Sequence, residues 1–342
     1  MSTADYNVSL TFKNGHSRAI TVPAGQSVLD AALAAEIPIL NQCHSGSCSS
    51  CQATLADGQA GMRAGASSTL LPSEFQAGQR LLCLTHPQSD CSFTLNYDND
   101  FASGKPAKAR AFIDEVDRLA HNVVRLTVEL ADGDWLEFKS GQFVQVTVPG
   151  VGSVRSYSPA STVRDLPKIV LLIRLLPDGA MSNYLRDSAK PDDILELEGP
   201  FGNFFLREKV MAPHIFVAGG TGIAPILSII DSIRLASGRR PPMLLSFGCA
   251  RPEDLFCLDD IALRQQWLPG LQARLSVDRD ARENLLLGNP VDALEPADVK
   301  HPATVAYLCG PPPMVDAAIV KLQALGVRRD NIYAEQFTAT HA

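Results

Sequence analysis

The sequence has neither of the apolar features that direct a chain to or across a membrane. Residues 1–6 hold no basic stretch and lead into no apolar one, so we expect no secretory signal. No run reaches the roughly eighteen apolar residues that a membrane-spanning helix needs, so we expect no such helix. These absences, in a chain with eight cysteines, favour the reducing cytoplasm, where thiolates bind metal rather than form disulfides.

A surplus of positive charge is also missing. The chain has 30 Lys and Arg residues against 37 Asp and Glu residues, a formal charge of −7, which argues against a nucleic-acid-binding surface. The first 100 residues are the more acidic part, with four basic side chains (Lys13, Arg18, Arg63 and Arg80) against eight acidic ones. Such a charge suits docking onto a basic patch of a protein partner, although solubility alone accounts for it equally well.

Length and composition describe a soluble globular protein of more than one domain. With 342 residues, 46% of them hydrophobic and 20% charged, the chain has room for about two to three domains. No internal repeat or low-complexity tract occurs. The domains must therefore be found from changes in pattern along the chain.

Four cysteines have the spacing of an iron–sulfur site. Cys43, Cys48 and Cys51 form a C-x4-C-x2-C motif, and Cys83 follows later, which is the plant-type spacing for a [2Fe–2S] cluster. Three thiolates on one short loop, rich in Gly and Ser, can wrap the cluster and turn backbone N–H groups toward its sulfurs. The alternatives are a zinc site, which usually shows two similar C-x2-C pairs, and a group of buried free thiols.

The elements around these cysteines resemble a plant-type ferredoxin of the β-grasp kind. Residues 7–13 and 18–22 alternate in polarity about an Asn-Gly turn and predict a β-hairpin. Residues 27–36 predict a helix with Ser27 as its N-cap, and Cys83 is expected at a strand end. Two departures from the ferredoxin pattern are His44, where Arg is common, and Ser49, where Gly is common.

A second domain is predicted after a polar, Gly- and Pro-containing segment at 98–108. From residue 109 to about 206 the pattern is β-like, with turn residues between strands, which suggests an antiparallel barrel. One helix is expected at 182–188, capped by Ser182. The predicted strands cover 111–117, 123–130, 142–148, 168–175 and 194–197.

From Met211 the pattern changes to alternating strands and helices, which predicts a parallel sheet with helices on both faces. The expected strands cover 214–218, 243–247, 272–276, 304–309 and 331–334, and the expected helices cover 225–235, 253–265 and 313–325.

Two segments of the barrel region are candidates for binding a flavin nucleotide. Arg155 can place its guanidinium on a pyrophosphate, and Tyr157 and Ser158 offer a flat ring and a hydroxyl to an isoalloxazine. Taken alone, such a run usually marks an ordinary strand end. In the segment 173–185, Gly179 and Ser182 open a helix whose N-terminal amides would receive a phosphate, or form a plain turn and cap.

Together these two segments resemble the FAD-binding pair of the ferredoxin–NADP reductase superfamily. The resemblance implies that the second segment contributes Arg174, Gly179, Met181 and Ser182 to the cofactor site.

Two further segments predict a site for a nicotinamide dinucleotide. Gly219, Gly220, Thr221 and Gly222 lie between a buried strand and a helix that carries Pro225 in its first turn, so the backbone can approach a pyrophosphate. A purely structural glycine turn is the alternative.

The superfamily resemblance extends to the C-terminal third of the chain. It implies that the segment Cys309, Gly310 and Pro311 brings the cysteine near the reacting nicotinamide carbon, although Cys309 would otherwise be read as a small buried hydrophobe. It also implies that Glu335 and Phe337 are the terminal acid and aromatic pair, with Phe337 covering the flavin face.

The sequence does not decide between NADH and NADPH. Glu253 or Asp254 would favour the free ribose hydroxyl of NADH, whereas Arg251 could accept a 2′-phosphate, and the family resemblance favours NADH. Cys91, Cys249 and Cys257 belong to no motif and are interpreted as structural.

Taken in order, these segments make the whole chain resemble the reductase component of aromatic-ring-hydroxylating dioxygenases, of the benzoate dioxygenase reductase type. The implied domains are a [2Fe–2S] ferredoxin at 1–98, a linker at 99–108, an FAD-binding β-barrel at 109–207 and an NAD-binding α/β domain at 208–342. The implied function is electron transfer from NADH through FAD and the cluster to a Rieske-type oxygenase. The alternatives are a reductase of a diiron monooxygenase and a structural zinc or redox-sensing module.

Overall fold

The computed structural model describes residues 5–41, 44, 46, 50–63, 70, 72–99, 106–207, 211–299 and 301–337. It divides into two compact units, one of residues 1–106 with 201–203 and the other of residues 107–200 with 204–342. The break at 106 falls within the polar segment that the sequence marks as a boundary.

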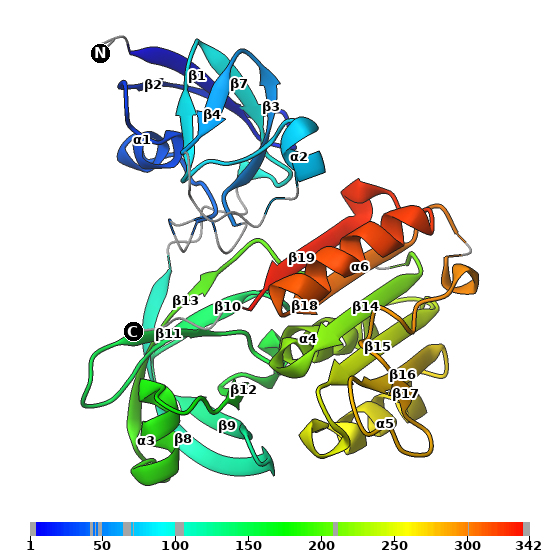
Figure 1. The fold of residues 1–342 in the computed structure, drawn as a ribbon. Helices are drawn as coiled ribbons and strands as arrows, with labels where there is room; N and C mark the ends of the chain where they lie inside the picture. Colours follow the sequence, from blue (N-terminus) through cyan, green and yellow to red (C-terminus); the bar gives the residue numbers. More distant parts are fainter. Residues whose placement is uncertain are drawn as a thin grey trace. The chain divides into compact units, whose positions relative to one another are not determined.

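The first unit is a mixed five-stranded sheet with short helices (Figure 1). The hairpin pairs β1 (Tyr6–Thr11) antiparallel to β2 (Ser17–Val22). Strand β7 (Cys91–Thr94) joins β1 in parallel, and β3 (Gln52–Asp57) joins β7 antiparallel. This arrangement is the β-grasp that the sequence predicts. Its strands in spatial order are β2 (Ser17–Val22), β1 (Tyr6–Thr11), β7 (Cys91–Thr94), β3 (Gln52–Asp57) and β5 (Gln79–Leu81), beside a pair formed by β4 (Ala60–Met62) and β6 (Thr85–Pro87).

The described residues of this unit form two helices, α1 (Val28–Ala34) and α2 (Pro72–Gln76). Ser27 caps α1 as expected, because its hydroxyl accepts a hydrogen bond from the Asp30 amide. The expectation for Cys83 is wrong in detail: β5 ends at Leu81, and Cys83 lies in the turn between β5 and β6.

The second unit begins with a six-stranded antiparallel sheet that closes on itself. Its strands in spatial order are β11 (Val154–Tyr157), β10 (Phe143–Thr147), β13 (Ile194–Phe201), β8 (Ala107–Ala120), β9 (Val123–Leu130) and β12 (Lys168–Arg174). An isolated bridge between Pro159 and Leu171 joins the two edges and makes the sheet the barrel that the turn spacing predicts. Buried aliphatic side chains from the inward-facing positions fill it.

The barrel carries one α-helix, α3 (Ala180–Asp187), and a single 3-10 turn, η2 (Val163–Asp165). The predicted start of α3 is wrong. Gly179 occupies the N-cap position, and Ser182 lies inside the first turn, where its hydroxyl accepts from the Leu176 amide at 2.9 Å instead of capping the helix.

The rest of the unit is a six-stranded, wholly parallel sheet in the order β17, β16, β15, β14, β18, β19. Its strands are β14 (His214–Gly219), β15 (Met243–Cys249), β16 (Leu271–Val277), β17 (Leu286–Leu287), β18 (Val305–Gly310) and β19 (Ile332–Gln336). The strand order reverses between β14 and β18. In open α/β sheets a ligand crevice forms at such a reversal, beyond the carboxyl ends of the strands.

Three helices connect these parallel strands: α4 (Ile223–Leu235), α5 (Leu258–Trp267) and α6 (Pro312–Ala324) (Figure 1). Short 3-10 turns lie at η3 (Gly220–Gly222), η4 (Pro252–Asp254), η5 (Pro296–Asp298) and η6 (Arg329–Asn331). The region 253–265, expected as one mostly helical stretch, is split between η4 and α5.

Candidate functional site

Two of the four predicted cluster ligands lie in the described part of the chain, and the fold brings them together. Cys51 immediately precedes β3, and the Cys83 amide donates to its Sγ at 3.5 Å. Both residues are buried. An amide directed at a cysteine sulfur is the kind of contact that tunes a cluster thiolate. Cys43 and Cys48 lie outside the described residues, among which no group of three or more potential ligands gathers.

The residues predicted to meet the flavin ring lie at one edge of the barrel. Arg155 and Tyr157 belong to β11, and Ser158 follows the strand directly. Tyr157 packs against the barrel core, and burial raises the pKa of its hydroxyl. Ser158 is buried, and the half-buried Arg155 donates to the neighbouring Val154 carbonyl oxygen at 2.9 Å.

The second predicted flavin segment forms the end of β12 and the start of α3. Arg174 is the exposed last residue of β12, whereas Met181 is buried in the barrel core. A Cβ on Gly179 would lie 2.8 Å from the Ser182 Oγ, so this turn has no room for a side chain. No side chain caps α3, so its first amides remain available to an anion such as a phosphate.

The predicted glycine turn lies at the strand-order reversal, between β14 and α4. A Cβ on Gly222 would lie 2.3 Å from the Cys309 carbonyl oxygen, and one on Gly219 would lie 2.7 Å from the Met314 Sδ. Gly220 has a positive φ of 53° and nothing within 4 Å of an added Cβ, so its backbone faces open space. The turn is therefore packed on one side and accessible on the other, as a phosphate-binding turn requires.

Other predicted dinucleotide residues surround this turn. Thr221 lies within η3, and Pro225 is buried in the first turn of α4. Gly310 ends β18, and Pro311 is the N-cap of α6. The two segments that the sequence assigns to the dinucleotide are therefore in direct contact.

Three buried side chains meet where the barrel adjoins the parallel sheet. The Ser158 hydroxyl donates to the Glu335 Oε2 at 3.4 Å, and Glu335 on β19 is the register partner of Cys309 on β18. Burial raises the pKa of Glu335 to about 8, against a smaller opposing effect of the Ser158 hydrogen bond. Burial, and next the Glu335 charge, raise the pKa of the Cys309 thiol well above its usual range. Both pKa shifts favour the neutral forms of Glu335 and Cys309.

Phe337 is anchored beside this group by its backbone. Its amide donates to the Gly310 carbonyl oxygen at 2.8 Å, and its half-buried ring packs against the core of the parallel sheet. This backbone hydrogen bond holds the aromatic side chain near the end of β18, the strand that carries Cys309.

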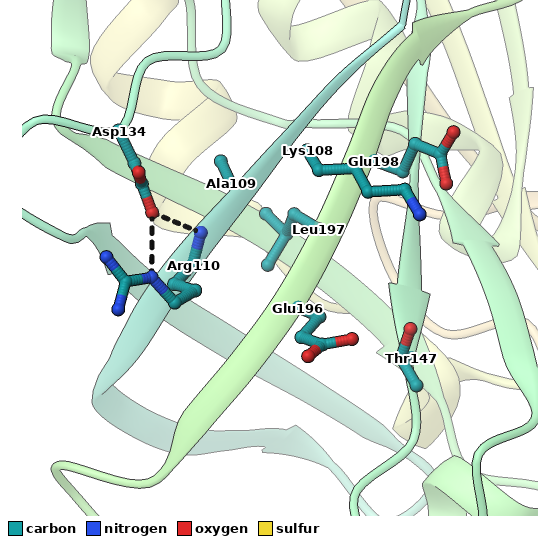
Figure 2. Close-up of a pocket in the computed structure, with 8 residues that line it drawn as sticks. All are labelled: Lys108, Ala109, Arg110, Asp134, Thr147, Glu196, Leu197 and Glu198. Atoms are coloured by element: carbon teal, nitrogen blue, oxygen red, sulfur yellow. Dashed lines mark hydrogen bonds and ion pairs between the residues drawn. The ribbon is translucent and has the colours of Figure 1, made fainter.

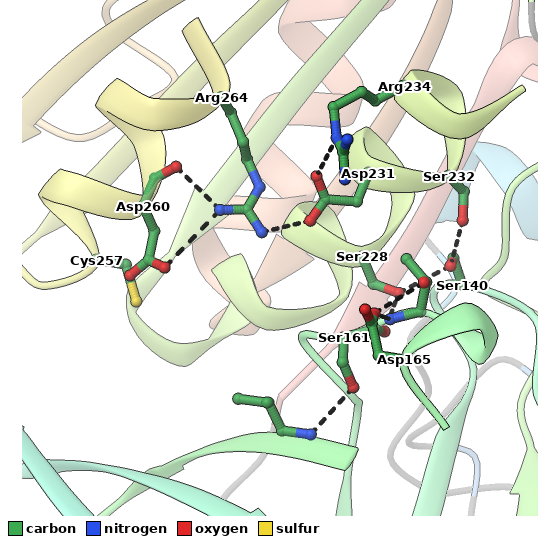
Figure 3. Close-up of polar contacts among 12 residues, drawn as sticks. Ser140, Ser161, Asp165, Ser228, Asp231, Ser232, Arg234, Cys257, Asp260 and Arg264 are labelled. Atoms are coloured by element: carbon green, nitrogen blue, oxygen red, sulfur yellow. Dashed lines mark hydrogen bonds and ion pairs between the residues drawn. The ribbon is translucent and has the colours of Figure 1, made fainter. Parts of the chain in front are cut away.

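A buried chain of serines links the barrel to α4 (Figure 3). The Ser228 hydroxyl lies 2.6 Å from the Ser161 carbonyl oxygen and 2.8 Å from the Ser140 Oγ, which is 2.6 Å from the Ser232 Oγ. Ser140 and Ser161 belong to the barrel, whereas Ser228 and Ser232 are one turn apart on α4. Sequence reasoning missed these residues, and only the i, i+4 spacing of the two α4 serines could have drawn attention to them.

Ion pairs make a second link between the same parts. Arg125 on β9 contacts Asp260 on α5 at 2.5 Å. Arg264 extends the chain from Asp260 to Asp231 on α4, and the Asp231 carboxylate also contacts the Arg234 Nε at 3.2 Å (Figure 3). Local spacing relates Asp260 to Arg264 on α5 and Asp231 to Arg234 on α4. The sequence gives no such signal for the pairs that join different elements, Arg125 with Asp260 and Arg264 with Asp231.

A shallow pocket of about 370 Å³ on the barrel contains none of the predicted site residues (Figure 2). Lys108 and Arg110 on β8 line it together with their register partners Glu198 and Glu196 on the adjacent strand β13. Arg110 also pairs with Asp134 at 3.2 Å. Opposite charges already face one another here, so the pocket gives no indication of a charged ligand.

Comparison with known families assigns all three parts of the chain. Residues 11–88 match the 2Fe-2S iron-sulfur cluster binding domain, residues 110–206 the oxidoreductase FAD-binding domain and residues 216–319 the oxidoreductase NAD-binding domain. The toluate 1,2-dioxygenase electron transfer component of Pseudomonas putida is 31% identical over 98% of this chain and 99% of its own length. The chain belongs to the family of oxygenase electron transfer components.

Relatives in this family serve oxygenases of several types by their names. The propane 2-monooxygenase reductase component of Mycolicibacterium smegmatis is 31% identical, with 92% of each chain covered. Methane monooxygenase component C of Methylosinus trichosporium is 38% identical over 72% of this chain and 73% of its own. Among solved structures, the Amycolatopsis cytochrome P450 reductase GcoB matches with a TM-score of 0.72 and 27% identity, covering 97% of this chain and 99% of that one.

Membership makes the chain an NADH-dependent flavin and iron–sulfur oxidoreductase, with a [2Fe–2S] cluster, FAD and NADH as cofactors. The features above suit these groups: an amide is directed at a cysteine sulfur, an uncapped helix follows the barrel, and a glycine turn faces open space. No described helix of this reductase has the length and apolar character needed to cross a membrane.

Proposed function

We propose that this reductase passes electrons from NADH, through FAD and the [2Fe–2S] cluster, to the Rieske-type oxygenase of an aromatic-ring-hydroxylating dioxygenase. The observation that carries the proposal is the meeting of Ser158 from the FAD-binding barrel with Glu335 and Cys309 from the NAD-binding sheet. The choice of partner is supported by the similarity to the toluate 1,2-dioxygenase electron transfer component over almost the whole of both chains.

The barrel residues would hold FAD. We assign Arg155 and the uncapped N-terminus of α3, with Gly179 and Ser182, to its phosphates. Tyr157 and Ser158 would contact the ring system, and Arg174 and Met181 complete the proposed set. The narrow turn at Gly179 supports this assignment, because a side chain there would fill the space before the helix.

The parallel sheet would hold NADH at the strand-order reversal. Gly219, Gly220, Thr221, Gly222 and Pro225 would present backbone amides to its pyrophosphate. Cys309, Gly310 and Pro311 would lie against its nicotinamide end. The open space at Gly220 and the tight packing behind Gly222 support this direction of approach.

The proposed roles in the reaction follow from burial and protonation. When bound, FAD would supply the chemistry that converts the two-electron donor NADH into single electrons for the cluster. Ser158 and Cys309 would fix the angle and distance between the two ring systems. Glu335, which is protonated at neutral pH, would hold a proton close to Ser158 without adding charge, and Phe337 would keep water away from the flavin face.

The proposed cluster ligands are Cys43, Cys48, Cys51 and Cys83. The contact between Cys51 and Cys83 supports the assignment of the second pair. We also propose the domain boundaries given by the sequence, with the ferredoxin ending at 98 and the NAD-binding domain beginning at 208. The three family matches lie inside those limits.

A second candidate partner is a monooxygenase of the diiron type. It is favoured by the similarity to the propane and methane monooxygenase components, whose identities to this chain equal or exceed that of the toluate dioxygenase component. Because the oxygenase rather than this chain binds the organic substrate, both candidates use the same reductase chemistry.

Reconstitution with purified oxygenases tests the choice of partner. The reductase, NADH and a Rieske-type benzoate or toluate dioxygenase should give dihydrodiol in proportion to the NADH consumed. A diiron phenol or methane monooxygenase should give no product above the rate without reductase. Product from the diiron enzyme alone would overturn the proposed partner and leave the reductase function intact.

A further inference from the structure

The segment that carries Ser158 is fixed to the barrel on one side and to helix α4 on the other. On the barrel side, the Ala160 amide donates to the Val170 carbonyl oxygen at 2.8 Å, and the Val170 amide donates to the Ser161 Oγ at 3.0 Å. On the other side, the Ser228 hydroxyl donates to the Ser161 carbonyl oxygen at 2.6 Å. Ser161 is only three residues after Ser158.

The direction of the Ser228 bond is set by its chemistry. A carbonyl oxygen can only accept, so the Ser228 hydroxyl is the donor to Ser161. The Ser140 Oγ, 2.8 Å away, is a second acceptor for the same hydroxyl. Ser228 is fully buried and Ser140 and Ser161 nearly so, so water cannot replace a lost bond at small cost.

Helix α4 also begins at the glycine turn proposed for the dinucleotide. Its first residue, Ile223, directly follows Gly222, and Ser228 lies five residues further along. One rigid helix therefore connects the dinucleotide turn to the carbonyl of Ser161. The ion pairs from Arg125 through Asp260 and Arg264 to Asp231 hold the same helix to the barrel from its C-terminal half.

We propose that Ser228 is a positioning residue for hydride transfer, which holds the Ser158 segment at the distance from the dinucleotide turn that the reaction needs. The inference rests on the function proposed above, because it takes Ser158 and the glycine turn to be the two sides of the reaction site. Loss of the Ser228 hydroxyl should move these two sides relative to each other and leave each cofactor-binding surface unchanged. A small misplacement of the reacting groups lowers the rate of hydride transfer much more than it lowers the affinity for NADH.

The chain provides a matched control in Ser246. Like Ser228, Ser246 is fully buried and its hydroxyl donates to a backbone carbonyl oxygen, that of Pro290, at 2.7 Å. Both ends of this bond belong to the parallel-sheet part of the chain, so it does not connect that part to the barrel. Ser246→Ala should therefore lose as much stability as Ser228→Ala without affecting the position of Ser158.

The experiment compares Ser228→Ala, Ser246→Ala and the unaltered holoenzyme. In anaerobic stopped-flow reduction by NADH, Ser228→Ala should slow flavin reduction about tenfold to a hundredfold while the Kd of NADH changes less than about threefold. Ser246→Ala should reduce the flavin at the normal rate. Backbone hydrogen–deuterium exchange of residues 158–163 should become faster in Ser228→Ala only. This measurement follows the Ser158 segment directly and requires no catalytic turnover.

The outcomes separate this inference from the function on which it rests. Equal reduction rates and equal exchange in Ser228→Ala and Ser246→Ala would overturn the positioning role. If Ser158→Ala slows reduction while Ser228→Ala does not, the reaction site holds and only the inference fails. If Ser158→Ala has no effect, the proposed site itself is wrong. Should Ser228→Ala not fold, Ser228→Cys keeps the side-chain volume with a weaker donor and should show a smaller loss in the same direction.

Discussion

At the scale of single residues, burial sets the protonation of the proposed reaction site. Glu335 is enclosed beside Ser158 and Cys309, and its pKa rises from a usual value of 4.5 to about 8. The native state therefore keeps a proton that the unfolded chain loses above pH 4.5. The stability that this proton contributes is complete below that pH and is lost as the pH rises through 8.

Replacing Glu335 by Gln should remove this dependence. We expect the free energy of unfolding of the unaltered protein to fall by a few kcal/mol between about pH 5 and pH 8 relative to that of Glu335→Gln. Urea unfolding at several pH values measures the difference. The exposed Glu253→Gln serves as the control and should follow the unaltered protein. Parallel curves for Glu335→Gln and the unaltered protein would contradict the raised pKa.

A second buried residue gives the opposite pH dependence. His214 on β14 stacks against Phe216 and Tyr307, with ring centroids 5.8 and 6.0 Å away, and burial lowers its pKa from 6.5 to about 4. The unfolded chain takes up a proton there that the native state excludes, so stability is lost as the pH falls from 6.5 toward 4.

The variant His214→Phe keeps an aromatic ring in this stack and cannot titrate. We expect it to lose less stability than the unaltered protein on acidification from pH 7 to pH 4, by about 3 kcal/mol. Thermal unfolding at both pH values measures this. An equal loss in the two proteins would show that His214 is not the group responsible.

At the scale of elements, periodicity in the sequence predicts most strands and helices, whereas helix starts and tight turns depend on contacts that it does not contain. The predicted strand at 123–130 is confirmed residue for residue. Ser182 was predicted to cap α3, but its hydroxyl bonds to the Leu176 amide and Gly179 begins the helix. The Ser182 hydroxyl can either cap the helix or accept a hydrogen bond from a nearby backbone amide, and the sequence does not show which of the two it does.

The glycine turn at the start of α4 gives a prediction at this scale. A Cβ in Gly222→Ala would lie 2.3 Å from the backbone oxygen of Cys309, so the turn and the end of β18 must separate. We expect reduction by NADH to slow by about a hundredfold or more, with FAD retained. The control is Gly270→Ala, in which the added Cβ lies 3.3 Å from the Pro241 oxygen and outside the proposed site. Normal reduction by Gly222→Ala would exclude this turn from the NADH site.

At the scale of the whole molecule, motifs predict which cofactors are bound and in what order, but not the contacts that join the parts. The cysteine spacing, the glycine turn and the Cys309 segment could all be identified from the sequence. Ser140 and Ser232 are 92 positions apart, and Arg125 and Asp260 are 135 apart, so no local pattern relates them. Glu335 was predicted from the family resemblance, but its contact with Ser158 requires the fold.

The separation of the flavin and iron–sulfur steps gives a prediction for the complete chain. Cys83→Ser should abolish electron delivery from NADH to cytochrome c, because the cluster loses a ligand, and should leave reduction of ferricyanide unaffected. The control Cys91→Ser removes another buried cysteine of the same unit that belongs to no motif, and should keep both activities. Loss of both activities in Cys83→Ser, with flavin retained, would contradict separate steps.

The most direct test of the electron path is an anaerobic titration of the purified protein with NADH, followed by visible absorption and electron paramagnetic resonance. The account predicts that flavin and iron–sulfur bands are both present and both bleach, and that the rhombic signal of a reduced [2Fe–2S] cluster appears. A flavin that bleaches while the cluster stays oxidised would contradict electron transfer between the two centres.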